Sequence, residues 1–133
     1  KDIINKNVKF RESFRPFAPS VLEEYYSKYF DIKQPSEHML IACNVKPKMK
    51  KYIPATVHVD NTCRIQTVTS NSNQKLYNLL NVMYKKTKVP VLLNTSFNIK
   101  GQPIVNSPKE AILCFLKYNI DFLFIGDYIL KKK

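Results

Sequence analysis

The chain has 133 residues, of which 44% are hydrophobic and 12% aromatic, a composition typical of one globular domain that excludes a disordered tail. The formal net charge of +12 leaves nucleic acid, an anionic membrane surface and anionic small molecules as partner classes, although scattered lysines favour solvated faces. The longest apolar runs are far too short to span a bilayer.

The first half of the chain alternates between short helical and extended patterns. A helix is expected over 2–9, because apolar side chains recur there after one helical turn. A strand over 17–22, an aromatic helix over 23–30 and a strand over 38–46 follow.

The middle of the chain predicts a hairpin. Segments 55–60 and 63–68 alternate in strand fashion, and the Asn61–Thr62 pair between them suits a tight turn. In this arrangement Arg64 and Gln66 lie on one face of their strand.

The second half reads as helix, strand, helix and strand. Leucines at helical spacing predict an amphipathic helix over 73–86, and the unbroken apolar run at 89–94 predicts a buried strand. A capping box at Ser107–Glu110 starts a helix through 111–118, and 122–130 closes the chain as one strand. We therefore expect an α/β fold with some parallel pairing.

Arginine usage hints at an oxyanion site. Only three of the 22 basic residues are arginines, and Arg11 and Arg15 lie four positions apart beside Lys9. A guanidinium grips two oxygens of a phosphate or carboxylate at once, which lysine cannot do. Arg64 lies inside a predicted strand and needs either a bound anion or an acidic partner such as Asp60.

A polar cluster follows the strand over 89–94. Asn94, Ser96 and Asn98 lie at the carboxyl end of a hydrophobic strand, where ligands bind in α/β sheets, although a simple polar loop has the same composition. With only two glycines there is no glycine-rich phosphate loop, so side chains must hold any phosphate. His58 is compatible with catalysis or with a hydrogen-bonded rim position.

Cysteine and histidine spacing argues against a metal site or a disulfide framework. The three cysteines are far apart without a CxxC motif, and neither histidine has ligand spacing, which favours a reducing cytoplasm and no metal within the chain. Because residue 1 is lysine and no apolar signal segment follows, we expect a fragment of a longer protein.

Four segments carry a resemblance to a known family: "KFRESFRPFAPSVL", "IPATVHVDNTCRIQTV", "VPVLLNTSFNIKGQPIV" and "FLFIGDYIL". Together they resemble the C-terminal domain of the carbamoyltransferases of the NodU and CmcH type, a domain similar to YrdC. The resemblance implies a YrdC-like twisted mixed sheet flanked by helices. It covers residues 1–133, lacking the domain's N-terminal edge and an actin-like partner domain.

The resemblance also implies a two-stage reaction. ATP and carbamoyl phosphate meet in this domain to give a carbamoyl adenylate and pyrophosphate, with Mg²⁺ compatible with the nucleotide. The actin-like domain, with its own metal, then passes the carbamoyl group to a hydroxyl acceptor. The implied partners are thus small molecules and that second domain, with no membrane and no nucleic acid. YrdC-like proteins carry a Lys-x-Arg pair and a Ser-x-Asn pair at the nucleotide site. The implied catalytic residues are Lys9, Arg11 and Arg64, and the implied substrate-binding residues are Ser96, Asn98, Arg15, His58 and Asn94.

The sequence departs from the family pattern in two ways, and two alternative functions stay open. The usual "HVDGTAR" is here "HVDNTCR", and Asn61 tolerates the positive φ of the glycine that it replaces. Without the actin-like domain this chain should not complete the transfer. Arg15, which directly precedes Pro16, suits the anchoring of its loop equally well. The alternative functions are a YrdC-like RNA-binding module and an inactive fragment.

Overall fold

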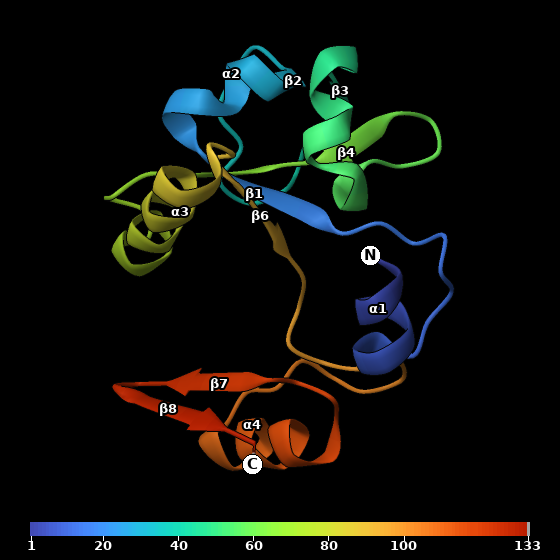
Figure 1. Ribbon diagram of the computed structural model, residues 1–133, viewed down its shortest axis with the longest axis vertical. Helices are drawn as coiled ribbons and strands as arrows, with labels where there is room; N and C mark the ends of the chain where they lie inside the picture. The colour runs from blue at the N-terminus through green and yellow to red at the C-terminus, as the bar shows by residue number, and fades with distance from the viewer. Residues whose placement is uncertain (133) are drawn as a thin grey trace. The chain divides into compact units, whose positions relative to one another are not determined.

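The computed structural model describes residues 1–132, which form two compact units (Figure 1). Unit 1 combines residues 1–15 with residues 96–132, and unit 2 is the continuous segment Pro16–Thr95. Each unit has its own hydrophobic core. The mixed α/β class expected from the sequence is confirmed, with the strands distributed over three small sheets.

The first sheet of unit 2 is mixed. Strand β1 (Ala18–Leu22) lies between β5 (Gln66–Val68), which is parallel to it, and β6 (Val91–Asn94), which is antiparallel. The register places Ser20 opposite both Gln66 and Leu92. Parallel pairing is thus present between β1 and β5, but not among the strands of the second half from whose order it was expected. Strand β1 is the central strand.

Helix α3 (Gln74–Thr87) connects β5 to β6 and confirms the amphipathic pattern. Asn73 caps its first turn by accepting a hydrogen bond from the Leu76 amide at 3.0 Å. Leu80 is fully buried and packs against Leu22 and Val68 from the sheet. The helix therefore forms because one apolar stripe covers the β1–β5 pair.

The second sheet of unit 2 is antiparallel. Its order is β2 (Phe30–Asp31), β3 (Ala42–Val45) and β4 (Thr62–Arg64). Two short helical turns, η2 (Glu23–Tyr25) and α2 (Tyr26–Tyr29), precede β2. Aromatic, aliphatic and cysteine side chains form the core of this part: Val21, Tyr29, Phe30, Cys43, Val45, Ile53, Cys63 and Ile65.

The predicted strand over 55–60 is wrong. The segment before β4 forms two 3₁₀ helices, η3 (Pro47–Tyr52) and η4 (Pro54–Thr56), and β4 pairs with β3 instead. Proline fixes φ and has no amide to donate to a ladder, so both helices begin at a proline. The tight turn survives, because the His58 amide donates to Thr62 O at 2.8 Å and Asn61 adopts a φ of 70°.

Unit 1 contains a helix, a hairpin and an N-terminal helical segment. Helix α4 (Pro108–Lys117) packs Ala111 and Phe115 against Leu123 of β7 (Phe122–Ile125). Strand β8 (Tyr128–Lys131) pairs with β7 in an antiparallel hairpin. The single strand expected over 122–130 is therefore wrong, because Gly126 takes a φ of 57° and reverses the chain.

The predicted N-cap of α4 at Ser107 is confirmed, while Glu110 reaches one residue further back than in a capping box. Ser107 Oγ accepts from the Glu110 amide at 3.3 Å, and Glu110 Oε2 accepts from the Asn106 amide at 3.1 Å. Across residues 1–132, no helix combines the length and the apolar character needed to cross a membrane.

Candidate functional site

Unit 1 holds a basic pocket of about 270 Å³ that collects most of the predicted anion-binding residues. Two segments far apart in the sequence form it, the turn after the N-terminal helix and the loop that begins at Ser96. The lining residues are Lys9, Arg11, Arg15, Ser96, Asn98, Ile99, Lys100 and Gly101. Four of the eight side chains carry a positive charge, so the pocket suits an anion.

A left-handed residue at the end of the N-terminal helix produces the turn. The helix starts as α1 (Asp2–Ile4), continues as the π-helix η1 (Asn5–Lys9) and ends at Phe10, which has a φ of 50°. The Arg11 amide then donates back to Asn5 O at 3.1 Å. The left-handed conformation costs about 1–2 kcal/mol for a non-glycine residue. The edge-on contact of the Phe10 and Tyr118 rings, with centroids 5.7 Å apart, offsets part of that cost.

Lys9 is buried beside the 96–98 loop. Its side chain is 5% exposed, and Nζ donates to Ser96 O at 2.6 Å, to Asn98 O at 2.7 Å and to Asn98 Oδ1 at 3.0 Å. An ammonium has three N–H donors, and three acceptors of the loop occupy them here. Lys9 therefore fixes the loop conformation and adds its positive charge to the wall of the pocket.

The 96–98 loop is also held by its own polar side chains. Ser96 Oγ donates to Asn98 Oδ1 at 2.6 Å, and Asn98 Nδ2 donates to Gln102 O at 3.0 Å. The chain turns back between Ile99 and Gln102, where Gly101 has a φ of 78° that favours glycine. Ser96 and Asn98 thus form one preorganised polar wall.

Asn5 organises the opposite wall, and the sequence analysis missed it. The side chain is fully buried, Nδ2 donates to Arg15 O at 2.8 Å and to Ser13 O at 3.4 Å, and Oδ1 accepts from Arg11 Nε at 2.8 Å. One amide therefore fixes both the loop after the helix and the Arg11 guanidinium. The available signal was an asparagine on the apolar stripe of the helix, one turn before Lys9.

Glu12 partly balances the charge of the pocket. Its carboxylate lies 3.1 Å from Arg15 Nε and 3.0 Å from Lys100 Nζ. Hydrogen bonds from its own backbone amide and from Lys100 hold the pKa of Glu12 below its ordinary value. Burial, followed by repulsion from Arg11, lowers the pKa of Lys9, and burial, followed by repulsion from Arg15, lowers the pKa of Arg11. An anion in the pocket would relieve this repulsion.

Three predicted site residues belong to unit 2. Arg64 is exposed at the end of β4 and, within residues 1–132, forms no ion pair; the suggested partner Asp60 instead accepts from the Thr62 amide and hydroxyl at 3.0 and 2.7 Å. His58 is half-buried in the turn before β4. Asn94 Nδ2 donates to Ser20 Oγ and Gln66 Oε1 at 3.1 and 2.9 Å, so it links the three strands of the mixed sheet.

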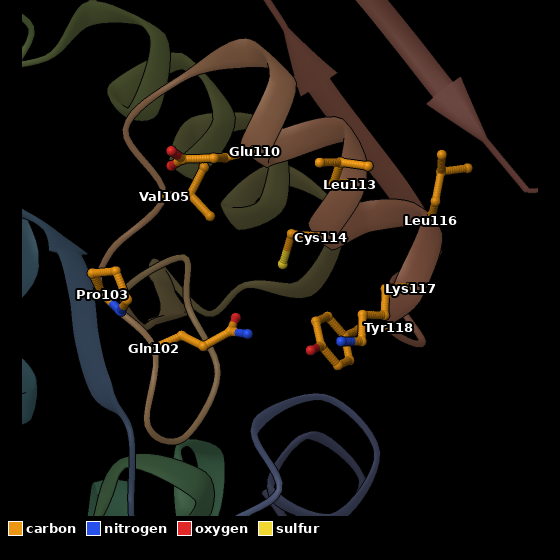
Figure 2. A pocket seen from close by; sticks show the side chains of 9 residues that line it. All are labelled: Gln102, Pro103, Val105, Glu110, Leu113, Cys114, Leu116, Lys117 and Tyr118. Carbon is orange, nitrogen blue, oxygen red and sulfur yellow. The ribbon is translucent and has the colours of Figure 1, made fainter.

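A second, larger cavity of about 680 Å³ lies in unit 1 (Figure 2). Helix α4 contributes Leu113, Cys114 and Leu116, and the segment before it contributes Pro103 and Val105. Figure 2 shows the Cys114 thiol pointing from the helix toward the space between the side chains of Gln102 and Tyr118. The main-chain oxygen of Gln102 also accepts the hydrogen bond from Asn98. The loop over 96–102 therefore contributes to both the basic pocket and the larger cavity.

The sequence matches a known family over the same residues. The match to the family described as Carbamoyltransferase C-terminus covers residues 1–132. The chain is 43% identical over 136 residues to nodulation protein NolNO of Sinorhizobium fredii, covering 100% of this chain and 20% of that protein. It is 39% identical over 152 residues to the uncharacterized protein sll1178 of Synechocystis, with 99% and 25% coverage.

An archaeal relative shows a similar relationship. The uncharacterized protein MJ1058 of Methanocaldococcus jannaschii is 40% identical over 133 residues, which covers 100% of this chain and 22% of that protein. The matched sequence therefore lies within much longer polypeptides in these relatives, and the chain spans about a fifth to a quarter of their length. The chain belongs to the carbamoyltransferase C-terminus family.

Proposed function

We propose that this chain is the part of an O-carbamoyltransferase that binds ATP and carbamoyl phosphate and forms a carbamoyl adenylate. The observation that carries the proposal is the convergence of Lys9, Arg11, Arg15 and Lys100 around one pocket, with the polar Ser96–Asn98 loop as its wall. Membership in the family gives the reaction class. The pocket supplies what polyphosphate chemistry requires, which is fixed positive charge in a preorganised site.

The proposed reaction explains why cations are needed. Water first hydrolyses carbamoyl phosphate to carbamate and inorganic phosphate. An oxygen of the carbamate then attacks the α-phosphorus of ATP and expels pyrophosphate. Negative charge then spreads over the α-phosphate and the leaving group. Guanidinium and ammonium groups stabilise that charge more in the transition state than in the ground state. We assign this role to Arg11 and Arg64, with Arg15 as a further phosphate contact.

The preorganised loop and the unit 2 residues have supporting roles. Lys9 holds Ser96 and Asn98 in place and contributes its charge, and the Ser96 hydroxyl orients a phosphate oxygen. We also propose that His58 and Asn94 contact the substrate. Since the basic pocket of about 270 Å³ suits a polyphosphate but is small for a whole nucleotide, we assign the nucleoside to the larger cavity beside α4.

Residues 1–132 offer few ligands to a resident metal. Within the part of the chain that the structure describes, no group of three or more His, Cys, Asp or Glu side chains could hold an ion. Mg²⁺ in nucleotide sites is held largely by substrate phosphates and water, and the basic pocket fits such a nucleotide-borne ion better than a protein-bound one. We propose that a metal of the transfer step belongs to a second, actin-like domain of the same polypeptide, which also selects the hydroxyl acceptor. We place the reaction in the cytoplasm, in keeping with three free cysteines.

Calorimetry with ATP and with carbamoyl phosphate tests the proposal. Arg11→Ala and Arg64→Ala should each weaken binding by roughly 10- to 100-fold, because a charge-assisted contact contributes about 1.5–3 kcal/mol. Lys85→Ala in α3 removes the same charge from an exposed residue that does not line the pocket, and it should leave binding unchanged. Mass spectrometry should detect carbamoyl adenylate only when both substrates are present.

The outcomes separate the proposal from its alternatives. Wild-type affinity in Arg11→Ala would remove the pocket assignment, and wild-type affinity in Arg64→Ala would remove the role proposed for Arg64. Salt-sensitive RNA binding that neither substitution affects would favour the RNA-binding module. If the protein bound neither substrate, the result would favour the inactive fragment.

A further inference from the structure

Two cysteines in unit 2 face each other across neighbouring strands. Cys43 on β3 is directly opposite Cys63 on β4 in the antiparallel register, with Ala42 opposite Arg64 and Asn44 opposite Thr62 on either side. The two Sγ atoms are 4.0 Å apart, and both thiols are free. Neither cysteine has a role in the proposed carbamoylation chemistry.

The backbone geometry admits a covalent bond between them. Directly opposed residues of an antiparallel pair have Cα atoms about 4.5–5.5 Å apart, and disulfides span Cα separations of about 4.4–6.8 Å. The ladder is fixed beside the pair, because the Val45 amide donates to Asn61 O at 3.0 Å. Bond formation needs the sulfurs to approach to about 2.05 Å, which rotation about the two Cα–Cβ bonds can supply without a change of register.

We propose that Cys43 and Cys63 form a peroxide-sensitive dithiol that is oxidised to an intramolecular disulfide between β3 and β4. In the first step the Cys43 thiolate attacks hydrogen peroxide, which gives the sulfenic acid and releases hydroxide. In the second step the Cys63 thiol attacks the sulfenic sulfur and forms the disulfide, and the sulfenic hydroxyl leaves with the Cys63 proton as water. The proton that Cys43 lost on ionising neutralises the hydroxide of the first step. Two thiols and one peroxide thus become one disulfide and two waters, with two electrons transferred.

Cys43 is the thiol that reacts first. It is 7% exposed, whereas Cys63 is fully buried, so a small oxidant reaches Cys43 with less opening of the sheet. The hydrogen bond from the Cys63 thiol lowers the pKa of Cys43, although burial and the charge of Asp31 oppose that effect. The same hydrogen bond and burial raise the pKa of Cys63, which therefore serves as the resolving thiol.

The disulfide would close the segment that carries η3 and η4. Cys43 and Cys63 are 20 positions apart, and the enclosed segment contains both 3₁₀ helices and the turn at His58. Arg64 follows Cys63 directly. Oxidation would therefore tie the position of this exposed arginine to the redox state of the core.

Counting alkylated thiols in the denatured protein tests the proposal. The reduced protein should take up three labels, one for each cysteine, and the peroxide-treated protein should take up one, on Cys114. Dithiothreitol should restore three labels, and peptide mapping should find Cys43 linked to Cys63. Cys114→Ser is the matched control and should change from two labels to none on oxidation, whereas Cys63→Ser should keep both of its labels as thiols or show a Cys43 oxyacid.

The proposal is overturned if wild-type protein keeps three reactive thiols after peroxide. It is also overturned if oxygen atoms are added without a cross-link, or if the cross-link involves Cys114 or a second molecule. Because the decisive count is made on the wild-type protein, impaired folding of a variant cannot obscure the result.

Discussion

Lys9 donates a hydrogen bond to the main-chain oxygen of Ser96 at 2.6 Å, across 87 positions of sequence. The same ammonium also contacts both oxygens of Asn98. A residue expected to touch substrate phosphates thus holds the polar loop that lines the pocket. The two roles, contacting phosphate and holding the loop, can be distinguished without ligand. Only the loop-holding role predicts that a substitution of Lys9 changes the free protein.

Replacing Lys9 by methionine should loosen the 96–98 loop. Methionine keeps most of the side-chain volume but leaves three acceptors without their charged donor, at a cost of about 2 kcal/mol. Amide hydrogen exchange in residues 96–102 should accelerate by roughly 30-fold, the factor that corresponds to that free energy. Lys6→Met on the same helix removes the same charge from an exposed position and should leave the exchange unchanged. Equal protection in Lys9→Met and the wild type would show that the loop holds its conformation by itself.

Replacing Asn5 by leucine should destabilise unit 1 and misplace Arg11. The substitution removes three side-chain hydrogen bonds and leaves the Ser13 and Arg15 carbonyls without a donor. We expect a loss of about 2–3 kcal/mol in the free energy of unfolding, read from urea titration. Asn7→Leu makes the same chemical change at a half-buried position of the same helix and should cost under about 0.5 kcal/mol. Similar losses in the two variants would mean that Asn5 has no special role.

Glu12 should make the stability of unit 1 depend on acid pH. Its pKa is lower in the folded protein than the ordinary value of 4.5, because its own amide and Lys100 stabilise the carboxylate. A carboxyl with a depressed folded pKa contributes stability above the unfolded pKa and loses it as the pH falls through the folded pKa. The difference in urea midpoint between wild type and Glu12→Gln should therefore be constant well above pH 4.5 and shrink as the pH falls below that value and through the folded pKa. A difference that persists at the acid end would assign the effect to packing instead of charge.

The sequence predicted the elements that depend on local chemistry. Helix α3 follows from leucines at helical spacing, and α4 follows from the Ser107–Glu110 capping box. The strand prediction over 55–60 was wrong because an alternating pattern does not show which strands pair, and β4 pairs with β3. The prediction of one strand over 122–130 was wrong because the strand pattern continues across Gly126, whose positive φ reverses the chain into a hairpin.

The candidate site was predictable only in part. Lys9, Arg11 and Ser96 could be nominated because their residue types suit phosphate. The hydrogen bond from Lys9 to Ser96 depends on a tertiary contact, and so does the pairing of Lys100 with Glu12. The sequence marked Asn5 only as a polar residue on the apolar stripe of the helix, because its importance comes from the two carbonyls and the guanidinium that the turn at Phe10 brings to it.

The register of β1 against β6 has a consequence for biosynthesis. Ala18 is opposite Asn94, so the two ends of unit 2 lie side by side once that unit has folded. A ribosome translates unit 2 completely before it reaches Ser96 and the later residues that complete the basic pocket. Prior folding of unit 2 then replaces a long flexible loop by a short closed one, which lowers the entropic cost of joining the first fifteen residues to the last part of the chain.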